Sequence, residues 1–173
     1  MKQVQLDKHE HTLRLEEGNI GTIEIVDLDG KGPYIYKAKS VHFNSPSEHK
    51  LNDHRMCLEM QILHDLVSGP HKASYHETQT IVAVLFEISD TTHTTIEKFQ
   101  ADVLGKVGEI NLGDIFKDQT DYYHYKGSLT APPALDVVNW FIMKNMLPIN
   151  PHQLSNLHDH WHDKIGFTNF RVI

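Results

Sequence analysis

Histidines are the residues of this sequence that most invite a chemical interpretation. The chain of 173 residues contains 14 of them, and imidazole is the commonest metal-binding side chain in proteins. His158, His160 and His162 alternate near the C-terminus, and the outer two would share one face of a helix. No carboxylate or cysteine set accompanies this run at matched spacing. We therefore interpret the run as the polar end of a helix, with a surface metal clip as the alternative.

Cys57 is the only cysteine. A disulfide within the chain is therefore impossible, and secretion gains no support from the cysteine content. No base is evident beside Cys57 in the sequence, so a packed thiol is a better interpretation than a nucleophile.

The composition is that of an ordinary globular protein, with 39% hydrophobic and 23% charged residues. Residues 1–173 amount to a single domain. The net charge of -7, without any Lys/Arg-rich run, argues against a nucleic-acid partner. The longest apolar run, residues 81–86, is far too short to cross a membrane.

Hydrophobic periodicity predicts a β-rich chain with short helices, and so an α/β domain built around one large mixed or antiparallel sheet. Asn150 followed by Pro151 is typical of a helix start, as an N-cap and first helical residue. Turns are expected at 29–33 and 52–53. The expected strands are 11–15, 21–28, 34–43, 56–64, 80–88 and 135–143, and the expected helical segments are 95–104, 112–116 and about 150–161.

Several motifs then follow one another in a fixed order. They are Val41-His42-Phe43-Asn44-Ser45-Pro46-Ser47-Glu48-His49, Leu58-Glu59-Met60-Gln61-Ile62-Leu63-His64, Tyr125-Lys126-Gly127-Ser128-Leu129-Thr130-Ala131-Pro132-Pro133 and Val138-Asn139-Trp140. Together they resemble the alpha-carbonic anhydrases, whose patterns are F-H-F-H with S-E-H, E-L-H-L-V-H, Y-x-G-S-L-T-T-P-P and V-x-W. Weaker agreement extends from His11-Thr12 to Asn169-Phe170-Arg171. The resemblance implies a central twisted, mostly antiparallel sheet with short peripheral helices.

The resemblance also implies a zinc site of three imidazoles, two from alternate residues of one strand and one from its neighbour. Zinc held in this way lowers the pKa of bound water, and the resulting hydroxide attacks carbon dioxide. Matched by motif, the three ligand positions are His42, Asn44 and Gln61. Only one is a histidine, and amide oxygens suit calcium-like ions better than zinc. The sequence therefore predicts a lost zinc site, with no metal or other cofactor.

The surroundings of the lost site are partly kept. The family places a glutamine two residues before its first ligand, to orient that ligand, and this chain has Ser40 there. Losing such a partner typically lowers metal affinity or activity about 10- to 100-fold. Glu59 matches the acid beside the third ligand. His49 and His64 match positions that the family keeps outside the set of zinc ligands.

Other catalytic positions are retained in type. Thr130 and Glu48 match the hydrogen-bonded pair that positions the zinc-bound hydroxide, and His11 falls where many members carry a proton-shuttling histidine. Because such residues also pack a core, we interpret them as vestigial rather than catalytic. The apolar wall of the carbon dioxide pocket is matched by Leu63, Val84, Leu129, Val138 and Trp140.

The resemblance leaves parts of the family's domain unmatched at both ends. Little precedes His11, and the chain stops at Ile173 where the family continues into a further strand. We therefore expect open strand edges and apolar surface. Other protein subunits of a larger complex are expected to cover the N-terminal edge and the C-terminal tail, without a membrane span.

The resulting interpretation is a catalytically inactive carbonic-anhydrase-like protein that serves as a structural or interaction subunit. Two alternatives remain: a residual or altered metal-dependent lyase or hydrolase, and a module that binds a small ligand in the vestigial cleft. The expected location is intracellular, with a mitochondrial respiratory complex and a cilium as candidate settings.

Overall fold

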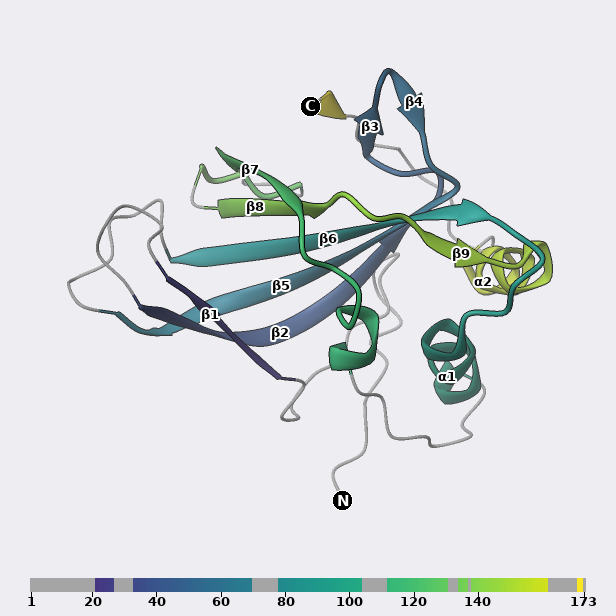
Figure 1. The fold of residues 1–173 in the computed structure, drawn as a ribbon, viewed down its shortest axis with the longest axis horizontal. Helices are drawn as coiled ribbons and strands as arrows, with labels where there is room; N and C mark the ends of the chain where they lie inside the picture. Colours follow the sequence, from purple (N-terminus) through teal and green to yellow (C-terminus); the bar gives the residue numbers. More distant parts are fainter. Residues whose placement is uncertain are drawn as a thin grey trace.

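The protein is built around a twisted sheet, seen in Figure 1. The computed structural model describes residues 21–26, 33–69, 78–103, 112–130, 134–136, 138–161 and 171–172. Within these ranges the sheet has seven strands, in the order β1-β2-β5-β6-β8-β7, and β9 pairs with β6. Among the pairs of this main sheet, only β6–β8 and β6–β9 are parallel. The strands are β1 (Thr22–Ile25), β2 (Tyr34–Asn44), β5 (Leu58–Ser68), β6 (Gln79–Ile88), β7 (Tyr122–Gly127), β8 (Val138–Met143) and β9 (Leu147–Ile149).

A small second sheet stands off the main one, on the side away from the helices (Figure 1). It contains β3 (His49–Leu51), β4 (His54–Arg55) and β10 (Arg171–Val172), in the order β10-β3-β4. Asn52 and Asp53 join β3 to β4 with φ angles of 51° and 63°. Two left-handed central residues are typical of a type I′ hairpin turn, so the turn predicted at 52–53 is confirmed.

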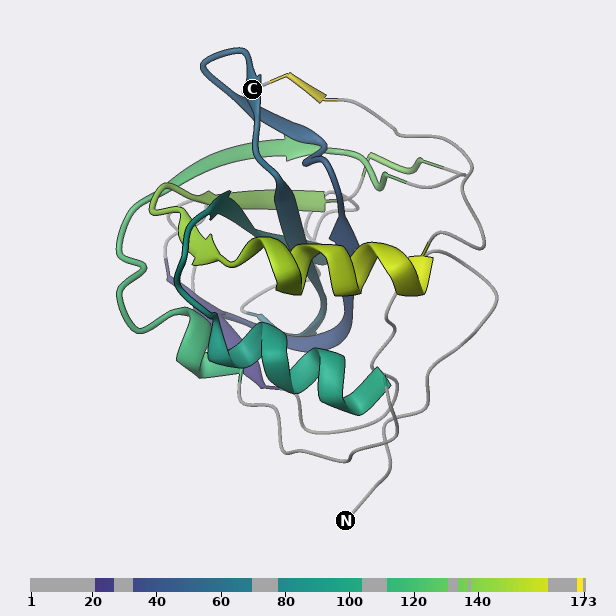
Figure 2. The ribbon, with the colours of Figure 1, turned by 90° about the vertical axis from the view of Figure 1, so that its right-hand side faces the viewer.

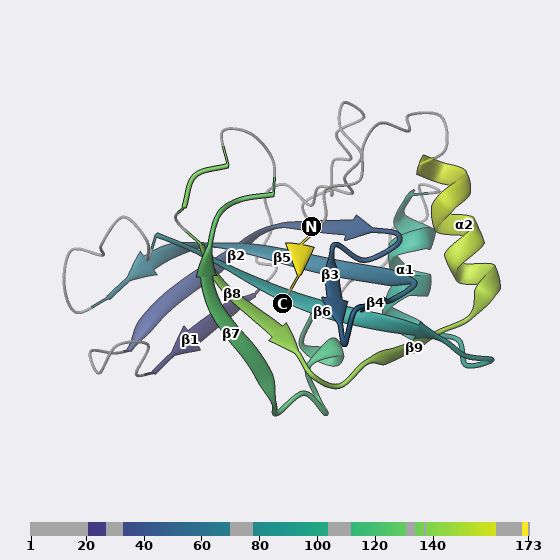
Figure 3. The same cartoon turned by 90° about the horizontal axis from the view of Figure 1, so that it is seen from above.

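Helices lie against one face of the main sheet, as Figure 2 shows for α1 (Thr94–Val103) and α2 (Pro151–Trp161). A short 3-10 helix, η2 (Leu112–Ile115), accompanies them. Figure 3 shows that α1 and α2 gather at one end of the strands. The predicted cap of α2 is confirmed, because the backbone N–H of His152 donates to Asn150 Oδ1 at 2.7 Å.

The two long helices are fastened to each other by a side-chain amide. Gln153 of α2 accepts from the backbone N–H of His93, just before α1, and donates to the carbonyl of the same residue, both at 2.9 Å. This pair of bonds fixes the start of α1 against α2.

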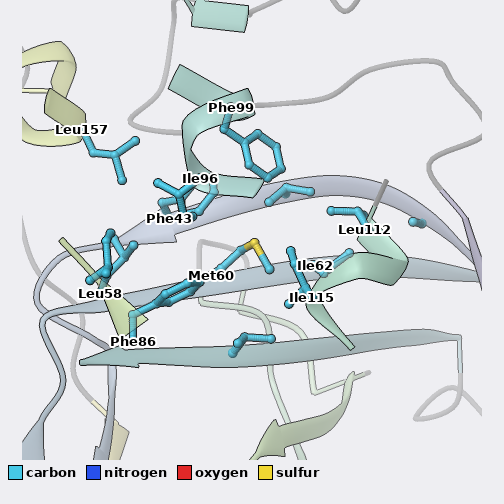
Figure 4. Close-up of a cluster of buried hydrophobic side chains, with 14 residues drawn as sticks. Phe43, Leu58, Met60, Ile62, Phe86, Ile96, Phe99, Leu112, Ile115 and Leu157 are labelled. Carbon is cyan, nitrogen blue, oxygen red and sulfur yellow. The ribbon is translucent and has the colours of Figure 1, made fainter. Parts of the chain in front are cut away.

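The main core fills the space between these helices and the sheet (Figure 4). Ile96 and Phe99 of α1 point at the strands, and the ring of Phe99 meets that of Phe43 edge-on at 5.2 Å. Because side chains alternate along a strand, every second residue of β5 enters this core. The buried members are Ala38, Val41, Phe43, Leu58, Met60, Ile62, Val84, Phe86, Ile96, Phe99, Leu112, Ile115, Ile149 and Leu157.

The β-rich fold predicted from the sequence is confirmed, with bounds shifted by a few residues. The expected strand at 11–15 lies outside the described residues, as does most of the turn at 29–33. Within the described ranges, no helix is long and apolar enough to cross a membrane.

Candidate functional site

The three positions matched to zinc ligands share the face of the sheet that is turned away from α1 and α2. His42 on β2 lies directly opposite Gln61 on β5, and Asn44 lies opposite Glu59. Met60, between the two β5 residues, enters the helix-side core, so its neighbours point to the other face. The structure thus brings these positions together, as the resemblance implies.

Gln61 is already engaged through its side-chain nitrogen. That nitrogen donates to Glu48 Oε2 at 2.9 Å and to Glu59 Oε1 at 2.8 Å. An amide NH2 group has two hydrogens, and two carboxylate partners use both of them. The reverse orientation would set the amide oxygen against two carboxylates, so the partners fix the orientation shown. The Gln61 nitrogen cannot serve as a metal ligand in this arrangement.

Glu59 also contacts a buried histidine, His49, which in turn contacts a tyrosine, Tyr125. Its Oε1 lies 2.6 Å from His49 Nδ1, and its Oε2 accepts from the His49 backbone N–H at 2.9 Å. His49 Nε2 lies 2.9 Å from the Tyr125 hydroxyl on β7. We call Glu48, Gln61, Glu59, His49 and Tyr125 the Gln61 network.

Burial and hydrogen bonding oppose each other at Glu59. The side chain is fully buried, and burial by itself raises the pKa of a carboxyl group. The hydrogen bonds and charge of His49, together with the bond from Gln61, outweigh burial and hold the pKa of Glu59 below its ordinary value. The carboxylate form of Glu59 is therefore the form that the site stabilises.

Trp140 supports the far end of the network. Its ring lies 5.0 Å from that of His49 and is stacked on that of Tyr125 at 5.9 Å. Its indole N–H donates to the Ser128 carbonyl at 3.1 Å, which ties the segment after β7 to β8. This segment carries Leu129 and Thr130, which are both half-buried.

His42 has a polar neighbour at position 40, where the resemblance implies a glutamine. The Oγ of Ser40 lies 2.8 Å from His42 Nε2. The glutamine of the family is replaced, but position 40 still contacts the ring, because residues two apart on a strand point to the same face. Even a short serine hydroxyl can then reach the neighbouring ring.

This donor set does not fit zinc. It offers one imidazole, whose Nε2 is in contact with Ser40, and two amides, one of which is bound to a carboxylate pair. Zinc sites need imidazole, thiolate or carboxylate ligands in tetrahedral array. Across the part of the chain that the structure describes, no group of three or more His, Cys, Asp or Glu residues is arranged to hold a metal ion.

Four of the five residues that the resemblance assigns to the apolar wall share one cluster, and the fifth lies elsewhere. Leu63, Leu129, Val138 and Trp140 pack together on the Gln61 face. The prediction for Val84 is wrong, because Val84 belongs to the helix-side core. Ile81, directly opposite Leu63, takes that place in the wall. Residues 81–86 are apolar on both faces of β6, so their sequence has no alternation that assigns a face.

The remaining candidates separate into those that the structure places and those outside its described ranges. His64 points to the helix side, where its Nδ1 lies 2.9 Å from the Ile62 carbonyl and burial lowers its pKa to about 4. His158 Nε2 lies 2.6 Å from Ser45 Oγ. His11, His162 and the side chain of His160 lie outside the described residues, so the His158–His162 metal clip stays untested.

Cys57 is a packed thiol, as its interpretation from the sequence requires. Its Sγ donates to the Phe86 carbonyl at 3.0 Å, and burial is the main cause that raises its pKa. A raised pKa leaves less thiolate at neutral pH, which disfavours a nucleophilic role.

Sequence reasoning missed the Gln61 network. Glu48 and Glu59 were assigned to separate roles, whereas one amide joins them. A buried acid two residues from Gln61 on the same strand was the available signal, since alternate strand residues share a face.

Comparison with other proteins gives the lineage of this fold. A family model described as eukaryotic-type carbonic anhydrase matches residues 1–171. Dioscorin dioA3 of Dioscorea japonica is 30% identical over 146 residues, which cover 80% of this chain and 49% of that protein. Alpha carbonic anhydrase 7 of Arabidopsis thaliana is 29% identical over 163 residues, covering 90% and 54%. The chain thus spans about half the length of these curated relatives.

Solved structures of carbonic anhydrases and of dioscorin are also similar to this chain. The alpha-carbonic anhydrase of Thermovibrio ammonificans, in complex with sulfanilamide, superposes with a TM-score of 0.72 at 25% identity, covering 94% of this chain and 67% of that one. Dioscorin complexed with ascorbate gives a TM-score of 0.63 at 25% identity, covering 94% and 69%. Since the family model reaches from residue 1 to residue 171, the chain belongs to the eukaryotic-type carbonic anhydrase family.

Proposed function

We propose that this protein is a catalytically inactive member of the family that acts as a structural or interaction subunit of a larger protein assembly. The observation that carries the proposal is the amide of Gln61, which bonds to Glu48 and Glu59 where the resemblance implies an imidazole bound to zinc. With Asn44 at a second ligand position, the site lacks the donors that would activate water.

Carbon dioxide hydration by the purified chain tests the first half of the proposal. We expect stopped-flow rates equal to the uncatalysed reaction, with and without added zinc, and substoichiometric zinc by elemental analysis. Hydration that zinc stimulates and a chelator abolishes would instead support a residual metal-dependent lyase.

Strand edges and exposed apolar side chains support the second half. Within the described ranges β7 pairs only with β8, and β1 pairs only with β2. Tyr122 on β7 is 51% exposed, and Val26 after β1 is 68% exposed. Open edges and exposed apolar groups are typical of surfaces that another chain covers.

Cross-linking within native complexes tests this assignment. We expect cross-links from the chain to other subunits near β1 and near the C-terminal residues. In size-exclusion chromatography of the native extract, we expect the protein to elute at an apparent mass well above its own. A protein that behaves as a free monomer in its own cells would contradict the proposal.

Binding of a small ligand is the second candidate function. A solved relative is described as dioscorin complexed with ascorbate, which supports a search for ligands of this size. Calorimetric titration with ascorbate, repeated on a Trp140→Ala variant, would detect binding at the Gln61 face. Binding that Trp140→Ala abolishes would favour a ligand-binding module over a purely structural subunit.

A further inference from the structure

Two carboxylates lie close together in the interior beside Gln61. Glu59 is fully buried and Glu48 is 8% exposed. Both accept from the same nitrogen, at 2.8 and 2.9 Å. Buried carboxylates without donors are strongly unfavourable, and neighbouring like charges add to the cost. The stability of the fold therefore depends on the groups that donate hydrogen bonds to this pair of carboxylates.

The amide of Gln61 supplies part of this hydrogen bonding, and it does so to both carboxylates at once. It supplies one N–H to each carboxylate and is itself only 3% exposed. A carboxylate at position 61 would place a third carboxyl group beside the pair, and an apolar side chain would remove one hydrogen-bond donor from each of them. Among side chains of this length, an amide is the neutral group that donates twice from one atom.

The Gln61 network extends over several parts of the fold. Glu48 and His49 precede and begin β3, Glu59 and Gln61 belong to β5, and Tyr125 belongs to β7. The bonds described above therefore join the small sheet, the centre of the main sheet and its outer strand. All five residues lie on the face opposite the helices, where α1 and α2 give no support.

We propose that Gln61 is a metal-independent lock of the fold, which uses the site of a lost zinc to hold β3, β5 and β7 together. This inference rests on the proposed absence of zinc at that site. It adds that position 61 contributes to stability because of its two hydrogen bonds, and not because of its volume.

The first test replaces the amide by an apolar group of similar size. Gln61→Leu keeps most of the volume, so a packing role predicts little change or a gain in stability. The lock predicts a fall in the melting temperature of about 10 °C or more, because two buried carboxylates each lose a donor. Gln79→Leu is the matched control, since Gln79 donates to a carboxylate, Asp65, in the same sheet at 2.9 Å. Asp65 is 43% exposed, so we expect a shift within about 2 °C there.

The second test uses charge. Gln61→Glu should destabilise the fold at neutral pH, and the gap to the native protein should narrow as the pH falls and the added carboxyl is protonated. A gap that is independent of pH would overturn the proposal.

The native protein supplies a readout that needs no variant. The two side-chain amide protons of Gln61 should give resolved NMR resonances that exchange slowly with solvent. Fast exchange of these protons would overturn the lock, and so would a Gln61→Leu variant with an unchanged melting temperature. Neither result would bear on the proposed lack of catalytic activity. Carbon dioxide hydration by the native chain would instead overturn the proposed function, even if the amide bonds were confirmed. If Gln61→Leu fails to fold, the amide exchange rates decide.

Discussion

His42 and Gln61 are direct neighbours across β2 and β5, and each already has a hydrogen-bonding neighbour. The ring of His42 meets the Ser40 hydroxyl at 2.8 Å, and the amide of Gln61 donates to Glu48 and Glu59. The two side chains thus lie at adjacent positions on one face, but only His42 has a group of the type that zinc binds. Restoring that chemistry should require new side chains but little change in the backbone.

Combined Asn44→His and Gln61→His substitutions should therefore recover zinc binding, at least in part. The two new imidazoles would join His42 on one face, and Glu59 would remain beside position 61 to orient its ring. Elemental analysis after dialysis should find zinc in the double variant and little in either single variant. A double variant that stays free of zinc would mean that β2 and β5 are spaced differently from a zinc-binding pair.

Tyr125→Phe should destabilise the fold moderately. The substitution removes the hydroxyl from His49 Nε2 but keeps the ring stacked on Trp140. A lost hydrogen bond of this kind costs about 1 kcal/mol, or about 2–4 °C in melting temperature for a chain of this size. Urea denaturation of both proteins measures the difference. Equal unfolding free energies would show that the hydroxyl contributes nothing to stability.

Stability should fall as the pH drops from about 6.5 to about 4, because burial lowers the pKa of His64 from 6.5 to about 4. In that interval the unfolded chain binds the proton and the folded chain does not. The contribution is complete above pH 6.5 and is lost toward pH 4, at up to about 1.4 kcal/mol per pH unit. Glu59, whose folded pKa is lowered, adds a further loss below its ordinary pKa of 4.5.

His64→Gln isolates the histidine part of this effect. The new amide can still donate to the Ile62 carbonyl but does not titrate. Chemical denaturation across pH 4 to 6.5 should give a flatter profile for the variant than for the native protein. Identical profiles would assign the acid sensitivity to other groups.

Cys57 should react slowly with thiol reagents near neutral pH. Burial raises its pKa, and its Sγ is held at the Phe86 carbonyl. A colorimetric thiol assay should give a rate below that of free cysteine at the same pH, and denaturant should abolish the difference. A rate above that of free cysteine would indicate an activated thiol.

Much of the fold could be predicted from local patterns, while β7 and β9 could not. β6 is almost continuously apolar, and the start of α2 has its cap residue, Asn150, in the sequence. β7 was not predicted, because Tyr122 and Tyr123 are both exposed and the strand shows no alternation. β9 contains Pro148 and only three residues, too few to show a period.

At the site, the sequence predicted which residues share a face but not how they interact. Motif positions placed His42, Asn44 and Gln61 together, since strand periodicity fixes the face of each. The partners of the Gln61 amide depend on the segment before β3, which brings Glu48 to β5 from outside the strand pair. Such a contact follows from tertiary packing, which no local pattern encodes. The wrong assignment of Val84 has a related cause, because an unbroken apolar run does not show which residues belong to which face of the strand.

Alternation along β5 divides the side chains around this strand into two layers. Met60 and Ile62 belong to the core beneath the helices, while Glu59, Gln61 and Leu63 belong to the opposite layer. Substitutions in the second layer alter chemistry without removing an atom from the main core. Side chains on this face can thus change while the helix-side core keeps its packing, provided that the buried carboxyl groups of Glu48 and Glu59 keep hydrogen-bond donors.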